Sequence, residues 1–306
     1  MTRMTDTSLE KTSPAGRTGP DDLVPSRYVL QVGEIEVLVI SDGALPFSPA
    51  TLGTNADPAD LAAWLDDLRQ PPDTFKWPLN VVVVRSGDQT VLVDTGVGAE
   101  FRDKPGTGRL ALRLDAAGID PASVTDVVLT HLHVDHVGGL LADGLRDGLR
   151  PDVPIHLAAA EAEFWKSPSF PPFMPTGIPD VLESAATRFL DKYRSQLRPF
   201  EEEHEVAPGV IVRRTGGHTP RHSVIRMASG GERLTFLGDA VFHNHFDYPN
   251  WYNAFDHDPE EAVRVRVRLL QEMAATRELL VAAHVSFPFG RVAIAGDVFR
   301  FIPAYW

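Results

Sequence analysis

One short segment constrains this chain of 306 residues more than any other. His131, His133, Asp135 and His136 form the pattern His-x-His-x-Asp-His directly after the apolar run 127–129. Neutral imidazole nitrogen and carboxylate oxygen are the donors that borderline divalent ions such as zinc prefer. Because the apolar run is typical of a strand, the pattern predicts a metal site in the loop that follows it. The alternative is a polar loop that is merely rich in histidine.

The composition excludes several other functions. There are no cysteines, so any metal must be held by His, Asp and Glu side chains. A formal net charge of −13 argues against nucleic acid or an anionic membrane as a partner, because both require basic surface. Hydrophobic residues make up 43% of the chain, as in soluble globular proteins, and none of the apolar runs is long enough to cross a membrane. We therefore expect a small-molecule substrate.

The first 27 residues differ from the rest of the chain. They are rich in Thr, Ser, Gly, Pro and Asp and lack the apolar stretch of a signal peptide. We expect residues 1–27 to be a flexible arm of a cytoplasmic protein, the alternative being residues added during cloning. Residues 28–306 are expected to form a single catalytic domain. A homodimer, through the arm or a proline-rich loop, is left open.

Strand-like and helix-like segments alternate along this domain. Runs rich in β-branched residues predict strands at 29–32, 34–40, 79–84, 90–93, 124–129, 155–157, 210–213, 223–226, 234–237 and 279–282. Helical spacing predicts helices at 58–70, 110–117, 159–165, 181–197 and 259–277, with Asp57 and Asp258 as caps and a proline-rich loop at 167–179. Two successions of strands, each with helices, indicate an α+β fold in which two sheets pack face to face with helices outside.

Three further metal-ligand side chains follow predicted strands. His218 comes after the strand at 210–213, Asp239 after that at 234–237 and His284 after that at 279–282. Functional side chains concentrate in the loops at strand ends, where a rigid scaffold positions them. Together with the opening pattern, the sequence predicts one metal centre built from four strand ends.

The order of these residues resembles the metallo-β-lactamase superfamily of hydrolases, from the strand before Asp94 to His284. The resemblance implies a four-layer αβ/βα sandwich with a two-metal site at one edge of the sheets. It assigns His131, His133 and His218 to the first metal, Asp135, His136 and His284 to the second, and Asp239 to a bridge between them. It also implies that Asp94 orients a ligand histidine, as ligand imidazoles require, and that His222 is a hydrogen-bond partner behind the ligands.

The same residues favour one branch of the superfamily. The commonest lactamases use a cysteine in the second site and lack the bridging aspartate, whereas this chain has Asp239 and no cysteine. The segments 75–80, 236–239, 255–260 and 282–290 resemble the branch of methyl parathion hydrolase and the N-acyl-homoserine lactonases. Two positions depart from it. Phe242 stands where the lactonases carry a tyrosine, so His243 or His245 is left as a nearby donor. Arg221 stands where glycine is usual.

The resemblance implies a hydrolase that cleaves a small, fairly apolar ester, lactone or phosphotriester with a hydroxide held by two divalent metal ions. Zinc is expected, although manganese, iron and cobalt accept the same donors. Asp239 would steer the nucleophile, and Asp135 or a metal-bound water would return a proton to the leaving group. The alternatives are a mononuclear iron dioxygenase of the same superfamily and a β-lactamase-like hydrolase.

Other side chains are candidates for the substrate pocket or for structural roles. The pocket candidates are Phe75, Trp77, Trp165, Phe173, Phe242, His243 and His245. His156, His204 and His257 are expected on the surface or in structural roles.

Overall fold

The computed structural model describes residues 26–101, 104, 106–142, 144–286 and 289–304. Most of the expected arm, residues 1–25, therefore lies outside the described residues, and the first strand begins at Arg27, beside the expected domain boundary. Within the described ranges, no helix is both long enough and apolar enough to span a membrane.

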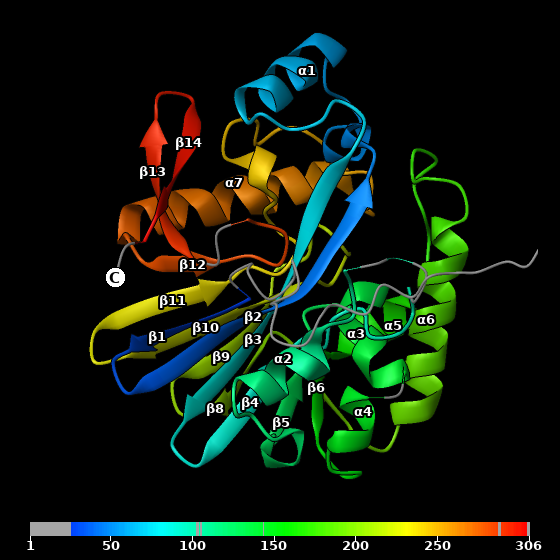
Figure 1. Cartoon of the computed structure of the whole chain (residues 1–306), viewed down its shortest axis with the longest axis vertical. Helices are drawn as coiled ribbons and strands as arrows, with labels where there is room; N and C mark the ends of the chain where they lie inside the picture. The colour runs from blue at the N-terminus through cyan, green and yellow to red at the C-terminus, as the bar shows by residue number, and fades with distance from the viewer. Residues whose placement is uncertain (1–25, 102–103, 105, 143, 287–288, 305–306) are drawn as a thin grey trace, which may run out of the picture.

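The first sheet contains the first seven strands in chain order (Figure 1). Neighbouring strands from the first to the fourth pair antiparallel, and neighbouring strands from the fourth to the seventh pair parallel. The strands are β1 (Arg27–Val32), β2 (Ile35–Phe47), β3 (Phe75–Ser86), β4 (Gln89–Val93), β5 (Asp126–Val128), β6 (Ile155–Ala158) and β7 (Leu197–Phe200).

The second sheet contains the other seven strands, in the order β14-β13-β12-β11-β10-β9-β8. Only β11 and β12 pair parallel, and the other neighbours are antiparallel. The strands are β8 (Glu203–Ala207), β9 (Val210–Arg214), β10 (Ser223–Ser229), β11 (Glu232–Phe236), β12 (Leu279–Val281), β13 (Gly290–Ala295) and β14 (Val298–Pro303).

Helices cover the outer faces of both sheets (Figure 1). Those against the first sheet are α2 (Leu110–Ala116), α3 (Val134–Leu141), α4 (Leu145–Gly148), α5 (Ala159–Phe164) and α6 (Ile178–Tyr193). Helix α7 (Pro259–Thr276) packs on the second sheet, and α1 (Pro58–Asp67) lies at the end of the molecule beyond β2 and β3. Single turns of 3-10 helix occur at Pro49–Leu52, Pro121–Ser123 and His243–His245.

Apolar side chains of the two sheets meet in a buried core, which makes the fold a four-layer sandwich. Val82 and Val128 of the first sheet and Val212, Ile225 and Phe236 of the second are each 0% exposed. Alternate residues of β3 face the other way, toward α2, α3 and α6, as the two-residue period of a strand requires. The predicted α+β sandwich is confirmed.

Most predicted elements are present, and the exceptions have local causes. Asp57 and Asp258 cap α1 and α7 by accepting backbone N–H bonds. Helix α6 begins at Ile178 rather than 181, because a proline at position 179 is tolerated in a first turn. The helix ends at Tyr193 rather than 197, where β7 begins instead. The sequence analysis missed α3, α4, β7, β8, β13 and β14.

Asp42 of β2 holds the loop that leads from β4 toward the predicted metal centre. Its side chain is 0% exposed, and its two oxygens accept the backbone N–H groups of Val97 at 2.8 Å and Leu110 at 2.7 Å. Burial raises the pKa of this carboxyl to about 7. The carboxyl therefore fixes the loop after β4 and the start of α2.

Replacing Asp42 with alanine leaves both of these buried N–H groups without an acceptor. We expect Asp42→Ala to lower the free energy of unfolding by about 2 to 5 kcal/mol, measured by urea denaturation. Asp88→Ala, in the exposed turn between β3 and β4, is the control and is expected to change it by less than about 0.5 kcal/mol. Equal effects of the two substitutions would contradict this role of Asp42.

Candidate metal centre

The seven predicted ligands meet at one edge of the sandwich, where strands of both sheets end. His131 and His133 follow β5, and Asp135 and His136 lie in the first turn of α3. His218 follows β9, Asp239 follows β11 and His284 follows β12. The full set is His131, His133, Asp135, His136, His218, Asp239 and His284. Since β4 pairs parallel with β5 and β11 with β12, the carboxyl ends of these strands share an edge. All seven are buried except Asp135, which is partly exposed.

These side chains form overlapping groups that could each hold a metal ion. The groups are His131 with His133 and His218, His131 with His136 and Asp239, and Asp135 with His136 and His284. The ligand atoms of each group lie within 4.8 Å of one another. This donor set supports the use of divalent metal. The ligation of a metal by these residues stays a prediction.

Asp239 lies between the two predicted metal positions. Its Oδ2 is 3.4 Å from His218 Nε2, on the first side, and 3.0 Å from His284 Nε2, on the second. Its Oδ1 is 3.2 Å from His136 Nε2. The carboxylate therefore faces both groups at once, as a bridging ligand must.

Fixed acceptors hold the outer nitrogens of the ligand imidazoles. His136 Nδ1 donates to Asp94 Oδ2 at 2.8 Å, and His284 Nδ1 donates to the carbonyl oxygen of Pro78 at 2.7 Å. His218 Nδ1 lies 2.9 Å from a carboxylate oxygen of Asp256. Each bond places a proton on the outer nitrogen, so Nε2 is the ring nitrogen that would offer its lone pair to a metal.

Asp94 also positions the opening pattern through Thr130. The Thr130 hydroxyl donates to Asp94 Oδ2 at 2.9 Å, so it can accept from His131 Nδ1 at 3.0 Å. Asp94 has a φ of 60°, a left-handed conformation that aspartate tolerates better than most residues. Asp94 therefore lies where it can orient two predicted ligands, His136 directly and His131 through Thr130.

His222 lies behind the bridging position. Its Nε2 accepts the backbone N–H of Asp239 at 3.2 Å, and its Nδ1 lies 3.2 Å from Thr215 Oγ1. Burial lowers the pKa of His222 to about 3, which keeps the ring neutral and able to accept. The geometry agrees with the expected role as a hydrogen-bond partner behind the ligands.

The charges in the site are arranged to attract cations. Burial alone would lower the pKa of His284, but the carboxylates of Asp239 and Asp135 raise it to about 10. Burial would raise the pKa of Asp239, but His284 and His136 hold it well below its usual range. Burial keeps the pKa of His133 well below its usual range, and the neighbouring histidines lower it further. The raised pKa of His284 keeps its ring protonated at neutral pH, so a metal ion would have to displace that proton, whereas the neutral ring of His133 is already in the form that binds metal.

Several buried ligand atoms have bonding needs that protein groups do not meet. Within the described residues, His131 Nε2 makes no hydrogen bond, and His136 Nε2 and Asp239 Oδ1 make none either, although they face each other at 3.2 Å. His133 Nδ1 lies 3.0 Å from His218 Nε2, although the bond to Asp256 leaves His218 Nε2 without a proton. Buried polar atoms without partners are rare and costly in native proteins. A divalent ion shared by these atoms would satisfy them, so the residues fit the predicted metal.

Comparison with known proteins places this site in a family. Residues 75–284 match the family model of the metallo-β-lactamase superfamily. The chain belongs to that superfamily. Two curated relatives are a β-lactamase-like protein 2 homolog of Drosophila melanogaster, 30% identical over 55% of this chain, and a probable metallo-hydrolase of Mycobacterium bovis, 25% identical over 54%. The matched regions span 51% and 57% of these relatives, about half of their lengths.

Solved structures resemble this superfamily member over nearly its whole length. AidC, described as a dizinc quorum-quenching lactonase, has a TM-score of 0.84 at 22% identity, covering 92% of this chain and 98% of its own. The hydrolase AbOPH has a TM-score of 0.82 at 26% identity, covering 92% and 99%. The likeness to AidC, below 25% identity, shows the shared fold.

Two buried charged residues that support the metal centre of this superfamily member were missed from the sequence. Asp256 bonds His218 through one oxygen, and its other oxygen accepts from Arg266 at 3.2 Å. Arg266 is 0% exposed and also donates to the carbonyl oxygens of Ala240, Pro249 and Trp251. Asp256 lies in a segment that resembles the lactonase branch, but the sequence does not reveal its partners.

A third missed residue, Glu161, connects two ligand-bearing loops. Its Oε1 accepts the backbone N–H of Leu132 at 3.2 Å and the indole N–H of Trp165 at 2.8 Å. Its Oε2 accepts the Thr219 hydroxyl at 2.8 Å. Glu161 therefore ties the loop of His131 and His133 to the loop of His218.

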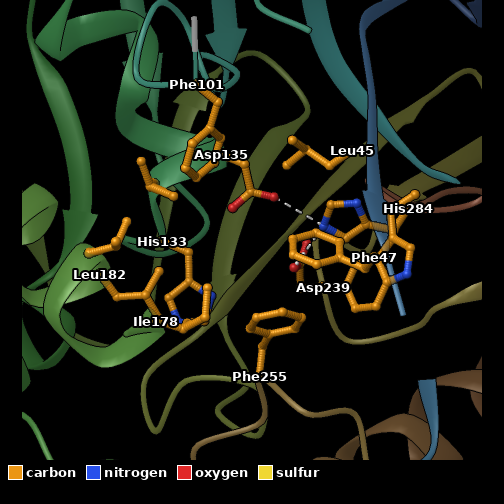
Figure 2. Close-up of a pocket in the computed structure, with 13 residues that line it drawn as sticks. Leu45, Phe47, Phe101, His133, Asp135, Ile178, Leu182, Asp239, Phe255 and His284 are labelled. Atoms are coloured by element: carbon orange, nitrogen blue, oxygen red, sulfur yellow. Dashed lines mark hydrogen bonds and ion pairs between the residues drawn. The ribbon is translucent and has the colours of Figure 1, made fainter. Parts of the chain in front are cut away.

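A pocket opens onto the ligands and is walled mainly by apolar side chains (Figure 2). His133, Asp135, Asp239 and His284 contribute its polar surface. The apolar walls come from β2, β3, the loop around position 101, the start of α3, α6 and the segment before α7: Leu45, Phe47, Trp77, Phe101, Val134, Ile178, Val181, Leu182 and Phe255.

Of the seven pocket candidates from the sequence, Trp77 lines this pocket, and the structure places the others outside its lining. Phe75 and His243 pack against Trp64, and Trp165 packs against the far side of His133. Phe173 lines a separate hollow. Phe242 stacks on the His284 ring, and His245 is buried, where its Nδ1 accepts the Phe242 backbone N–H.

Proposed function

We propose that this chain is a metal-dependent hydrolase that cleaves ester, lactone or phosphotriester bonds in small, fairly apolar substrates. The observation that carries the proposal is the convergence of seven ligand-type side chains, four of which line an apolar pocket. The description of AidC as a dizinc lactonase and of AbOPH as a hydrolase supports the class of reaction.

Two divalent ions, most simply zinc, would be held by the two groups of side chains. His131, His133 and His218 would hold the first ion and Asp135, His136 and His284 the second, with Asp239 shared. When bound, such a pair polarises the oxygen of the bond to be cleaved and lowers the pKa of a water molecule so that hydroxide is available near neutral pH.

The carboxylates of the chain then direct the reaction. Asp239 is fixed by its backbone bond to His222, so its oxygens stay aimed at both groups of ligands and can orient the attacking nucleophile. Asp135 lines the pocket, and its Oδ2 faces His284 at 3.4 Å (Figure 2). Its other oxygen is left to take up the proton that the attacking water releases and to pass it to the leaving group.

Phe242 occupies the position where the lactonases carry a tyrosine. Its ring stacks on His284 with centroids 5.0 Å apart and an interplanar angle of 12°. It holds the ligand in place by packing but offers no hydroxyl. The described lining of the pocket likewise contains no tyrosine, which leaves the return of the proton to Asp135 or to a metal-bound water.

The apolar walls predict that activity increases with the length of an apolar chain on the substrate. Burying one methylene group contributes about 0.8 kcal/mol, which corresponds to roughly a fourfold gain in kcat/KM. We expect Ile178→Ser, at the pocket wall, to reduce this dependence. Ile294→Ser, at a position that is 64% exposed on the hairpin of β13 and β14, is the matched control. Equal chain-length dependence in both variants would contradict the assignment of the pocket.

The direct test is a panel of lactones, aryl esters, phosphotriesters and β-lactams assayed with protein of known metal content. We expect hydrolysis of at least one of the first three classes and little of β-lactams. Metal-replete protein that hydrolyses none of them, or that binds a single iron and consumes oxygen, would refute the proposal.

A further inference from the structure

His257 lies between the first metal group and the loop that joins α5 to α6. Its Nε2 is 3.1 Å from His133 Nε2, and its Nδ1 is 2.9 Å from the carbonyl oxygen of Ser169 in that loop. Its backbone N–H donates to the carbonyl oxygen of His218 at 2.8 Å. His257 therefore contacts two of the three predicted ligands of the first metal.

When both rings are neutral, the protons in this chain of hydrogen bonds have one consistent arrangement. A carbonyl oxygen only accepts, so the Ser169 oxygen requires a proton on His257 Nδ1. The neutral His257 ring then accepts at Nε2, which requires that His133 donate from its own Nε2. His133 Nδ1 is thereby left without a proton, and this nitrogen faces His218 Nε2 at 3.0 Å. The contact with Ser169 thus selects the form of His133 that can bind metal.

The loop on the other side of this contact leads into the pocket wall. Residues 165–177 lead directly into α6, whose residues Ile178 and Leu182 line the pocket. The rings of Phe164, Trp165 and Phe170 surround His257, with centroids 5.2 to 5.5 Å away. The aromatic packing and the bond to Ser169 fasten the loop to the same imidazole that supports His133.

We propose that His257 is a positioning residue that sets the tautomer of His133 and couples the first metal site to the loop 165–177. The inference rests on the proposed function, because it requires metal at that site. Coupling between two sites is reciprocal, so metal at the first site should in turn order the loop. Partners behind metal-binding histidines typically change metal affinity by about 10- to 100-fold.

Variants of His257 separate hydrogen bonding from packing. His257→Phe keeps an aromatic ring but removes both hydrogen bonds, whereas His257→Gln retains an acceptor for His133 and a donor for Ser169. His204→Phe is the control, because His204 stacks on His156 and lies outside the site. Cobalt(II) is titrated into metal-free protein and followed by its absorbance, and amide hydrogen exchange of the loop is measured with and without cobalt.

The expected results concern metal affinity and loop protection rather than activity. His257→Phe should weaken cobalt binding at the first site by about 10- to 100-fold, which shifts one of the two cobalt transitions. It should also abolish the metal-dependent protection of the loop. His257→Gln should stay within about threefold of the wild type, and His204→Phe should match it. Unchanged affinity and protection in His257→Phe, or equal losses in Phe and Gln, would overturn the proposal.

A measurement on the unaltered protein covers the case in which His257→Phe does not fold. Nitrogen-15 spectra of the zinc-loaded wild type should show the proton on Nε2 of His133 and on Nδ1 of His257. A proton on Nε2 of His257 would overturn the proposal. Wild-type protein that binds no metal would instead refute the proposed function, which distinguishes the two failures.

Discussion

Replacing Asp239 with alanine is expected to reduce kcat/KM by about 1,000-fold or more and to remove at least one metal ion from the protein. The reason is its position, since its oxygens lie within 3.4 Å of nitrogen atoms from both predicted metal groups. Without this carboxylate, the imidazoles of His136 and His284 lose a negative charge that lies 3.2 Å and 3.0 Å from their Nε2 atoms and raises their pKa. Elemental analysis together with hydrolysis kinetics measures both effects.

Two further variants make the result interpretable. Asp239→Asn keeps the shape of the side chain but removes its charge, and it should show most of the same loss. Asp297→Ala, at an exposed position between β13 and β14, controls for the removal of a carboxylate elsewhere and should leave both readouts unchanged. An Asp239→Ala protein with full metal content and undiminished hydrolysis would show that Asp239 is not a bridge.

Removal of metal by a chelator is expected to abolish hydrolysis and to lower the melting temperature. Each ion at 100 times its dissociation constant stabilises the native state by about 2.7 kcal/mol, so the loss of two ions should lower Tm by roughly 10 °C. The buried atoms of His131, His136 and Asp239 that make no hydrogen bond would again be unsatisfied. Calorimetry and activity assays before and after adding back zinc measure the effect.

The matching control is a chelator-treated sample restored with magnesium, which prefers oxygen donors and should recover neither activity nor stability. Full activity in protein shown by elemental analysis to be free of metal would contradict the two-metal account.

The convergence of the predicted ligands could be predicted because they lie near the ends of recognisable strands. His218, Asp239 and His284 come after short apolar runs, and the sandwich brings those strand ends to one edge. The layers could be predicted for the same reason, since the two-residue and helical periods of the sequence reflect which faces are buried. Short strands such as β7 were missed because most of their residues are exposed and the pattern is weak.

The pocket could not be predicted, because an apolar residue suits a core as well as a pocket wall. Phe47, Phe101, Ile178 and Phe255 come from four separate segments, and only the tertiary fold brings them together (Figure 2). Phe75 and Phe242 are equally apolar, but their side chains pack inside the protein rather than on the pocket wall.

The supporting residues were missed for a related reason. Asp256 acts through His218 and His257 contacts His133, and these contacts join residues 38 and 124 positions apart in the chain. The sequence analysis expected a surface or structural role for His257. The structure instead places it beside a predicted ligand, partly buried, where burial lowers its pKa to about 4 and keeps the ring neutral.

The central claim is that two metal ions lie on either side of Asp239. Anomalous diffraction at the zinc edge, from crystals of zinc-loaded protein, tests it most directly. The account predicts two strong peaks, one among His131, His133 and His218 and one among Asp135, His136 and His284, each within bonding distance of Asp239. A single peak, or peaks away from these side chains, would contradict it.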